Sequence, residues 1–156
     1  MIKTDAPPEL STLCTGCSAC ANICPRDAIS MNWSPSGFLT PAVNLEACVH
    51  CGLCTKTCPD LNPPAQPPQA FDEPRAYAAW ALDEAVRLNS SSGGVFTILA
   101  RHILAQGGVV YGVAWNTDGE LSVRHVRLDS LPELKLLNGS KYLQADPGHA
   151  YRDIKK

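Results

Sequence analysis

The chain has 156 residues, 45% of them hydrophobic, and a formal net charge of −2. This length allows one ordinary domain or two small ones, and it excludes a large enzyme with its own substrate domain. This hydrophobic content and low net charge exclude a chain that is intrinsically disordered. The nearly balanced charge also gives no reason to expect nucleic acid or a membrane surface as a partner.

The sequence also gives no sign of a membrane span or a leader. Its longest apolar runs, such as 109–114, fall far below the roughly 18 residues that a span requires. Residues 1–10 contain Asp5, Glu9 and two prolines in place of the apolar stretch of a signal peptide. We therefore expect a soluble, cytoplasmic protein.

All eight cysteines lie before residue 60, in two copies of one motif. Residues 14–25 read CTGCSACANICP and residues 48–59 read CVHCGLCTKTCP, so both copies have the spacing C-x2-C-x2-C-x3-C-P at an offset of 34 residues. An offset shared by every cysteine and by the final proline indicates an internal duplication. The spacing is typical of bacterial proteins with two [4Fe–4S] clusters, in which the fourth cysteine of each motif binds the other cluster.

The spacing also has a physical reason. A cubane cluster needs four thiolates from different directions, and three cysteines on a tight loop can bind one face of it. The fourth ligand then arrives from the opposite copy, and the proline after it turns the chain away. We therefore predict one cluster on Cys14, Cys17, Cys20 and Cys58, and a second on Cys48, Cys51, Cys54 and Cys24. Four small residues between the ligands would let backbone amides reach the sulfurs, namely Gly16, Ser18, Ala19 and Gly52.

Other uses of these cysteines stay open at this point. Zinc held by four cysteines also uses C-x2-C pairs, although such sites usually separate the two pairs by a longer spacer. A degraded or incomplete cluster is a further alternative, and four disulfides are disfavoured because a cytoplasmic protein keeps its thiols reduced. His50, between two predicted ligands, is a candidate for tuning the second-loop cluster. No residue stands out as a catalytic acid or base, since His102 falls on a predicted helix and His125 on a predicted strand.

Residues 1–60 are predicted to form a ferredoxin-like module. Short apolar stretches at 28–31 and 39–43 flank a Ser-Pro-Ser-Gly turn at 34–37, which favours a hairpin between the two cysteine loops. A core this small needs further support, so we expect the clusters to supply much of its folding energy. Residues 61–74 form a proline-rich, semi-rigid linker.

Residues 75–156 have a different composition and form the second predicted domain. The expected elements are, in chain order, a strand over 75–82, a helical turn over 83–88, a helix over 95–106 ended by Gly107 and Gly108, strands over 109–115 and 121–128 around a turn at 116–119, a helix over 131–137 with Glu133 as a capping partner, and a helix that begins after Pro147.

Two turns in this second domain suggest a binding site. Residues 90–94, Ser-Ser-Ser-Gly-Gly, open the predicted helix and offer unpaired N–H groups to a phosphate or a flavin pyrophosphate. The stretch lacks the lysine of a P-loop and the spacing of a dinucleotide fingerprint, so the local pattern by itself favours an ordinary helix cap with a flexible lead-in. Residues 138–142, Asn-Gly-Ser-Lys-Tyr, form the second turn.

The order of these features resembles the N-terminal part of the beta subunit of coenzyme F-420 hydrogenases and dehydrogenases. The discriminating segments are SSSGGVFT and GSKY, whereas the cysteine motifs are shared with many ferredoxins. The resemblance spans nearly all of residues 10–156. It implies an α+β protein in which a ferredoxin-like 2[4Fe–4S] module precedes an α/β domain, and because family members extend further, we expect this α/β domain to be truncated.

The resemblance also implies a function. In that family the beta subunit carries a flavin and iron–sulfur clusters and moves electrons between them, so FAD is an implied second cofactor. The segments near the flavin would include Ser91, Ser92, Gly93, Gly94, Gly139, Ser140 and Lys141. The implied partners are a redox protein or other oxidoreductase subunits. The alternative is a non-enzymatic, ferredoxin-type electron carrier with a docking domain, so whether this chain is itself an enzyme is left open.

Overall fold

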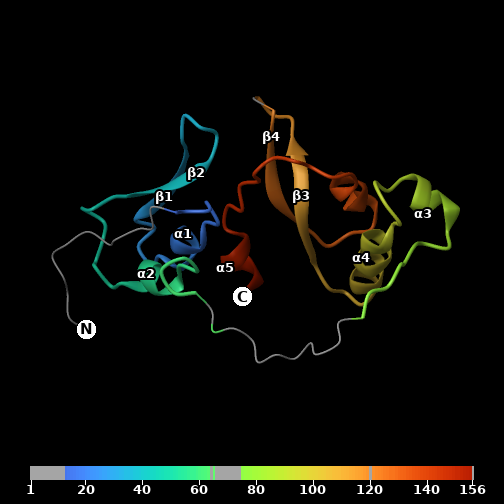
Figure 1. The fold of residues 1–156 in the computed structure, drawn as a ribbon, viewed down its shortest axis with the longest axis horizontal. Coiled ribbons are helices and arrows are strands. Elements are labelled where there is room, and N and C mark those ends of the chain that lie inside the picture. Colours follow the sequence, from blue (N-terminus) through green and yellow to red (C-terminus); the bar gives the residue numbers. More distant parts are fainter. Residues whose placement is uncertain (1–12, 64, 66–74, 120, 156) are drawn as a thin grey trace. The chain divides into compact units, whose positions relative to one another are not determined.

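The computed structural model describes residues 13–63, 65, 75–119 and 121–155. The chain divides into two compact units (Figure 1), one containing residues 1–68 and 146–156 and the other residues 69–145. Both contain helices and antiparallel strands, which confirms the predicted α+β class. The longest helix in the described residues, Val95–Ala105, has 11 residues, and none there has the length and apolar character of a membrane span. Most of the predicted linker over 61–74 lies outside the described residues.

The first unit is built around a hairpin and two short helices. Its elements are α1 (Ala19–Ile23), β1 (Ile29–Trp33), β2 (Leu39–Val43), α2 (Leu53–Thr57) and α5 (Ala150–Ile154). The strands pair antiparallel, with Ile29 opposite Val43 and Trp33 opposite Leu39, so the predicted hairpin is confirmed. Leu39 is only 1% exposed and, with Ala28 and Ile29, belongs to the small apolar core of this unit.

The sequence duplication is visible in the backbone of the first unit. Helices α1 and α2 lie 34 residues apart, and each ends at the fourth cysteine of its motif. Cys24 and Cys58 both leave the helix in an extended conformation, with φ of −67° and −69° and ψ of 116° and 120°. A following proline disfavours helical geometry in the residue before it, so Pro25 and Pro59 explain why both helices stop at the cysteine.

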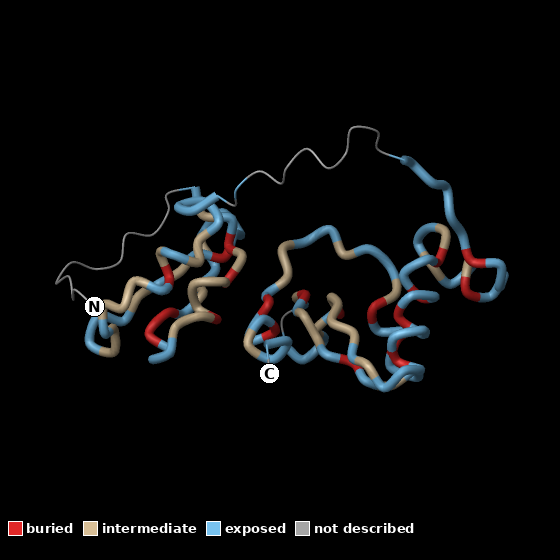
Figure 2. Tube along the Cα trace, turned by 90° about the horizontal axis from the view of Figure 1, so that it is seen from below, coloured by how far each residue is buried: buried red, intermediate tan, exposed pale blue. Residues whose placement is uncertain are grey.

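The second unit packs one long helix and a 3-10 helix against a hairpin. Its elements are α3 (Glu84–Leu88), α4 (Val95–Ala105), β3 (Val110–Asn116), β4 (Ser122–Leu128) and the 3-10 helix η1 (Pro132–Leu137). Strands β3 and β4 pair antiparallel along their whole length, as predicted. The buried core consists of Ala100, Ala114, Leu128, Leu134 and Leu137. Figure 2 shows that burial in both units is confined to short stretches.

Local signals explain how the helices of the second unit begin and end. The Asp83 carboxylate accepts hydrogen bonds from the amides of Ala85 (2.9 Å) and Val86 (3.3 Å), which caps α3. Helix α4 gives way to Gly107, whose φ of +76° suits glycine. The predicted helices over 83–88 and 95–106 are therefore confirmed.

Three features differ from the predictions. Residues 75–82, all of them described, form no strand, because only Ala81 finds a backbone partner there, donating to the Gly93 carbonyl at 2.6 Å. Residues 132–137 form a 3-10 helix, and the Ser130 hydroxyl donates to the Glu133 carboxylate itself instead of capping the helix. The predicted C-terminal helix exists as α5, but residues 146–156 group with the first unit and not with the second.

Candidate functional site

One cavity of the first unit brings together cysteines from both motifs. Its wall contains Cys14, Cys17, Cys20 and Cys58, which are the four ligands predicted for the first cluster. Met31 and Pro41, which face each other across the hairpin, form another part of the wall. The cysteines thus surround a largely apolar space, and a cavity with this donor set fits a cubane cluster. Among the described residues, no three His, Cys, Asp or Glu side chains form a tight group of the kind that holds a single metal ion.

The two cysteine loops hold their first sulfur in the same way. The amide of Gly16 donates to Cys14 Sγ at 3.4 Å, and the amide of His50 donates to Cys48 Sγ at 3.4 Å. Cys24 Sγ accepts from the amide of Ala28 at 3.3 Å. Amide donors of this kind orient the sulfur and provide hydrogen bonds to a metal-binding thiolate. All eight cysteines lie in the described residues and are free thiols, so none of them forms a disulfide.

Both loops reach this geometry through two residues in the left-handed region. In the first loop they are Gly16 (φ 68°) and Ser18 (φ 61°), and in the second His50 (φ 51°) and Gly52 (φ 71°). These positions correspond at the offset of 34, but glycine occupies the first site in one copy and the second site in the other. His50 thus adopts a backbone conformation that glycine reaches more readily, and its amide donates to Cys48 Sγ.

Burial acts against the charge that iron binding requires. The pKa of Cys20 is raised to about 11, mainly by burial and to a smaller extent by the nearby Cys17 and Cys14, against the lowering effect of a backbone hydrogen bond from Ala21. Burial also raises the pKa of Cys54, the equivalent cysteine of the second motif. Both thiols are therefore protonated near neutral pH in the absence of metal, and each must release its proton when it becomes a ligand.

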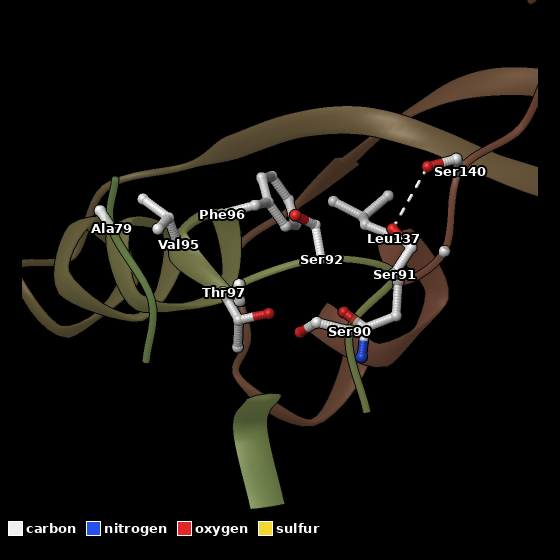
Figure 3. Close-up of a pocket in the computed structure, with 13 residues that line it drawn as sticks. Ala79, Ser90, Ser91, Ser92, Val95, Phe96, Thr97, Leu137 and Ser140 are labelled. Carbon is white, nitrogen blue, oxygen red and sulfur yellow. Dashed lines mark hydrogen bonds between the residues drawn. The ribbon is translucent and has the colours of Figure 1, made fainter. Parts of the chain in front are cut away.

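The second unit contains a pocket where its two predicted turns meet (Figure 3). The pocket has a volume of about 340 Å³ and is lined by residues 90–97 and 137–140 together with Ala79. The hydroxyls of Ser91 and Ser140 lie 3.2 Å apart and form a hydrogen bond between the two turns. Six of the seven residues predicted to lie near a flavin therefore line one pocket: Ser91, Ser92, Gly93, Gly94, Gly139 and Ser140.

Close packing explains the two glycines at the start of α4. A Cβ atom at Gly93 would lie 2.6 Å from the Ala79 carbonyl oxygen, so any other residue would force the backbone apart. Gly94 caps α4 with φ of +80°. The first turn of a helix leaves N–H groups without helical partners and carries a partial positive charge. The described lining holds no charged side chain, so its polar groups are these dipoles and the uncharged side chains of the serines, Thr97 and Asn138.

Lys141 is the predicted site residue that the structure places elsewhere. Its ammonium donates to the carbonyls of Asn138 (2.8 Å) and Leu136 (3.3 Å), at the end of η1, and the residue does not line the pocket. Partial burial lowers its pKa. Phe96 and Thr97 also line the pocket, and sequence reasoning missed them because their only signal is their place beside the first turn. Asn138, the first residue of the second predicted turn, lines the pocket too.

Comparison with known proteins matches each unit to a family. Residues 13–61 match the 4Fe-4S dicluster domain. Residues 76–149 match the N-terminal domain of the coenzyme F420 hydrogenase/dehydrogenase beta subunit. The boundaries of the two matches agree closely with the change in composition seen in the sequence.

Individual relatives match over a short stretch only. The chain is 34% identical over 59 residues to an iron-sulfur subunit of the CoB–CoM heterodisulfide reductase from Methanocaldococcus jannaschii, covering 30% of this chain and 9% of that protein. It is 38% identical over 58 residues to a polyferredoxin-like protein of the same organism, covering 32% and 34%. It is 40% identical over 43 residues to the ferredoxin-type protein NapF of Haemophilus influenzae, covering 28% and 24%. The chain thus spans about a third or less of the length of these relatives.

The two family matches confirm the predicted resemblance. The eight cysteines support two [4Fe–4S] clusters, and the first unit has an iron–sulfur electron-transfer function. The chain thus combines a segment that matches the 4Fe-4S dicluster domain with a segment that matches the N-terminal domain of the coenzyme F420 hydrogenase/dehydrogenase beta subunit.

Proposed function

We propose that this chain is part of a flavin-dependent oxidoreductase, in which the cluster unit relays electrons between a flavin and an external carrier. Its partners are a redox protein or other oxidoreductase subunits in the cytoplasm. The observation that carries this proposal is the pocket at the start of α4, which unites the two turns expected to lie near a flavin.

The proposed cluster ligands divide between the motifs. Cys14, Cys17, Cys20 and Cys58 would hold one cluster, and the cavity that they line supports this crossed set. Cys48, Cys51, Cys54 and Cys24 would hold the other. The extended conformation of both fourth cysteines supports the crossing, because each directs the chain out of its own loop.

The pocket would bind the phosphate-bearing part of FAD. The α4 amides and the hydroxyls of Ser91, Ser92 and Ser140 are donors suited to phosphate oxygens, and Gly93 and Gly94 leave room for close approach. Bound flavin supplies conversion between two-electron and one-electron transfer, which clusters that carry single electrons need. Lys141 would act indirectly in this arrangement, by fixing the end of η1 and so the position of the second turn.

The test is FAD binding to the full chain with both clusters loaded under anaerobic conditions. Quenching of flavin fluorescence should report binding to the wild-type chain. The double variant Ser91→Ala/Ser140→Ala should bind FAD roughly ten-fold or more weakly, because each lost hydrogen bond is worth about 1 kcal/mol.

The matched control is Ser36→Ala, which removes an exposed hydroxyl from the hairpin turn of the first unit. It should bind FAD like the wild type. Loaded clusters without any FAD binding would contradict the flavin proposal and favour the electron carrier with a docking domain. Equal binding by the wild type and the double variant would place the flavin elsewhere.

A further inference from the structure

Arg152 of α5 holds the end of α1 through an unusually complete set of hydrogen bonds. Its guanidinium donates to the carbonyls of Ala21 (2.7 Å), Asn22 and Cys24 (2.9 Å), and to the carboxylate of Asp27. The last carbonyls of a helix have no helical partners, so this one side chain satisfies several of them. Its side chain is only 28% exposed.

A buried asparagine reinforces the same contact. Asn22 is only 7% exposed. Its side-chain Nδ2 donates to the Gly148 carbonyl at 2.7 Å, and its side-chain Oδ1 accepts from the backbone N–H of Arg152 at 3.3 Å. Residues 148–152 are therefore fixed to α1 through both backbone and side chain. All of these residues belong to the first unit, although Asn22 and Gly148 lie 126 positions apart in the chain.

Within the described residues, the second cysteine motif has a different support. The residue equivalent to Asn22 is Lys56, which is exposed. The Thr55 carbonyl, equivalent to that of Ala21, accepts instead from the side chain of Asn62 at 2.6 Å. At α2 the helix-end carbonyl thus accepts from the neutral side chain of the nearby Asn62, whereas at α1 the donor is the charged side chain of the distant Arg152. The ends of the two helices therefore differ in the charge of the side chain that holds them.

We propose that Arg152 is a positioning residue that fixes Cys24 as the crossed ligand and holds a positive charge beside the cluster that Cys24 binds. This inference rests on the proposed crossed binding of two clusters. The guanidinium contacts the backbone of Cys24 directly, so the ligand cannot shift without breaking that contact. Asp27 partly offsets the charge, but its side chain is 71% exposed and is better screened by water than Arg152.

The direction of the effect follows from charge. Reduction adds one electron to a cluster and makes it more negative, so a nearby positive charge stabilises the reduced form and raises its potential. Loss of Arg152 should therefore lower the potential of the Cys24-bound cluster more than that of the other. Lys155, which shares a groove with Arg152 beside α1 and α2, remains in place in such a variant.

The test is an EPR-monitored redox titration with dithionite on the full chain carrying Arg152→Gln or Arg152→Lys. The potential that moves should be the one whose signal is missing in Cys24→Ser. Arg152→Gln should shift the potential of this cluster to a more negative value, and Arg152→Lys should keep the potential close to that of the wild type. Arg127→Gln, which removes an exposed arginine paired with Asp129 in the second unit, is the control and should shift neither potential.

Each outcome decides the proposal. Full iron loading of Arg152→Gln with both potentials unchanged would overturn it. If Arg152→Gln instead loses one cluster while Arg152→Lys retains both, the positioning role is supported. Loss of both clusters from both variants would show a general structural role and overturn the proposal. A wild-type chain that binds no iron would overturn the crossed clusters themselves, which separates that failure from the failure of Arg152.

Discussion

The two cysteine motifs share one backbone but are supported in different ways. Helices α1 and α2 begin after a left-handed residue and end at an extended cysteine before proline. The first motif is held by the distant Arg152 and the buried Asn22, whereas the second is capped by the nearby Asn62. Both copies therefore keep the backbone conformation that positions the cysteines, whereas the side chains that hold the ends of the two helices differ.

This difference separates two demands on a cluster-binding loop. The conformation of the loop is set by cysteine spacing, by a left-handed glycine and by the final proline, and both copies contain all three. The environment of the loop is set by whatever packs against the outside of the helix, and at the first copy this is the C-terminal segment. The following variants test how far the two copies remain equivalent.

The largest expected effect comes from exchanging the fourth cysteines for serine, one at a time. Cys24→Ser should damage the cluster of the second loop, and Cys58→Ser should damage that of the first, because each of these cysteines is proposed to bind the cluster of the other copy. Each variant should lose about half of the roughly eight iron atoms that two cubanes contain. Iron and acid-labile sulfide analysis measures the loss, and EPR identifies the cluster that remains. Damage to the cluster of the same loop would contradict the crossed assignment.

A smaller and strongly unequal effect is expected at the equivalent positions 22 and 56. Asn22→Ala removes the buried partner of Gly148 and of the Arg152 amide, and should cost about 1–3 kcal/mol because buried groups lose their hydrogen bonds. Lys56→Ala alters an exposed side chain and should change stability by less than about 0.5 kcal/mol. The midpoint for guanidinium-induced loss of cluster absorbance, measured anaerobically, gives the comparison. Equal midpoints for the two variants would show that the C-terminal segment adds no stability.

The smallest effect is expected from the left-handed positions of the second loop. His50→Gly relieves a non-glycine residue at φ of 51° and should stabilise the loop by up to about 1 kcal/mol. Gly52→Ala should destabilise it by about the same amount through strain alone, since an added Cβ would meet nothing nearer than Thr55 Oγ1 at 3.8 Å. Both variants keep every cysteine, so the rate of cluster loss in denaturant is a suitable measure. Effects of the same sign would contradict the backbone explanation.

Much of the fold was predictable because its signals are local. The offset of 34 residues, the hairpin turn at Gly37 and the helix that ends at Gly107 each depend on short, recognisable segments of sequence. Residues 75–82 show the limit of such reasoning. Their apolar side chains favour a strand, but a strand needs a neighbour along its length, and within this described stretch only Ala81 has one.

The candidate site was predictable to a similar degree. The spacing identified the cysteines, and the two Ser/Gly turns proved to line one pocket. Lys141 could not be placed from sequence, because nothing in the GSKY segment shows that its ammonium would bind the carbonyls at the end of η1. Arg152 carried no signal either, since its partners lie in and just after a helix 125 to 131 positions earlier in the chain.

The return of residues 146–156 to the first unit has a consequence for the order of assembly in the cell. A ribosome releases residues 13–58, with all eight cysteines, well before it has synthesised Arg152. The contacts of α1 with Gly148 and Arg152 can form only after the whole second unit has been translated. If iron–sulfur clusters are inserted into the nascent chain, the Asn62 cap of the second motif can already be in place. The carbonyls at the end of α1 then still lack their hydrogen bonds from Arg152.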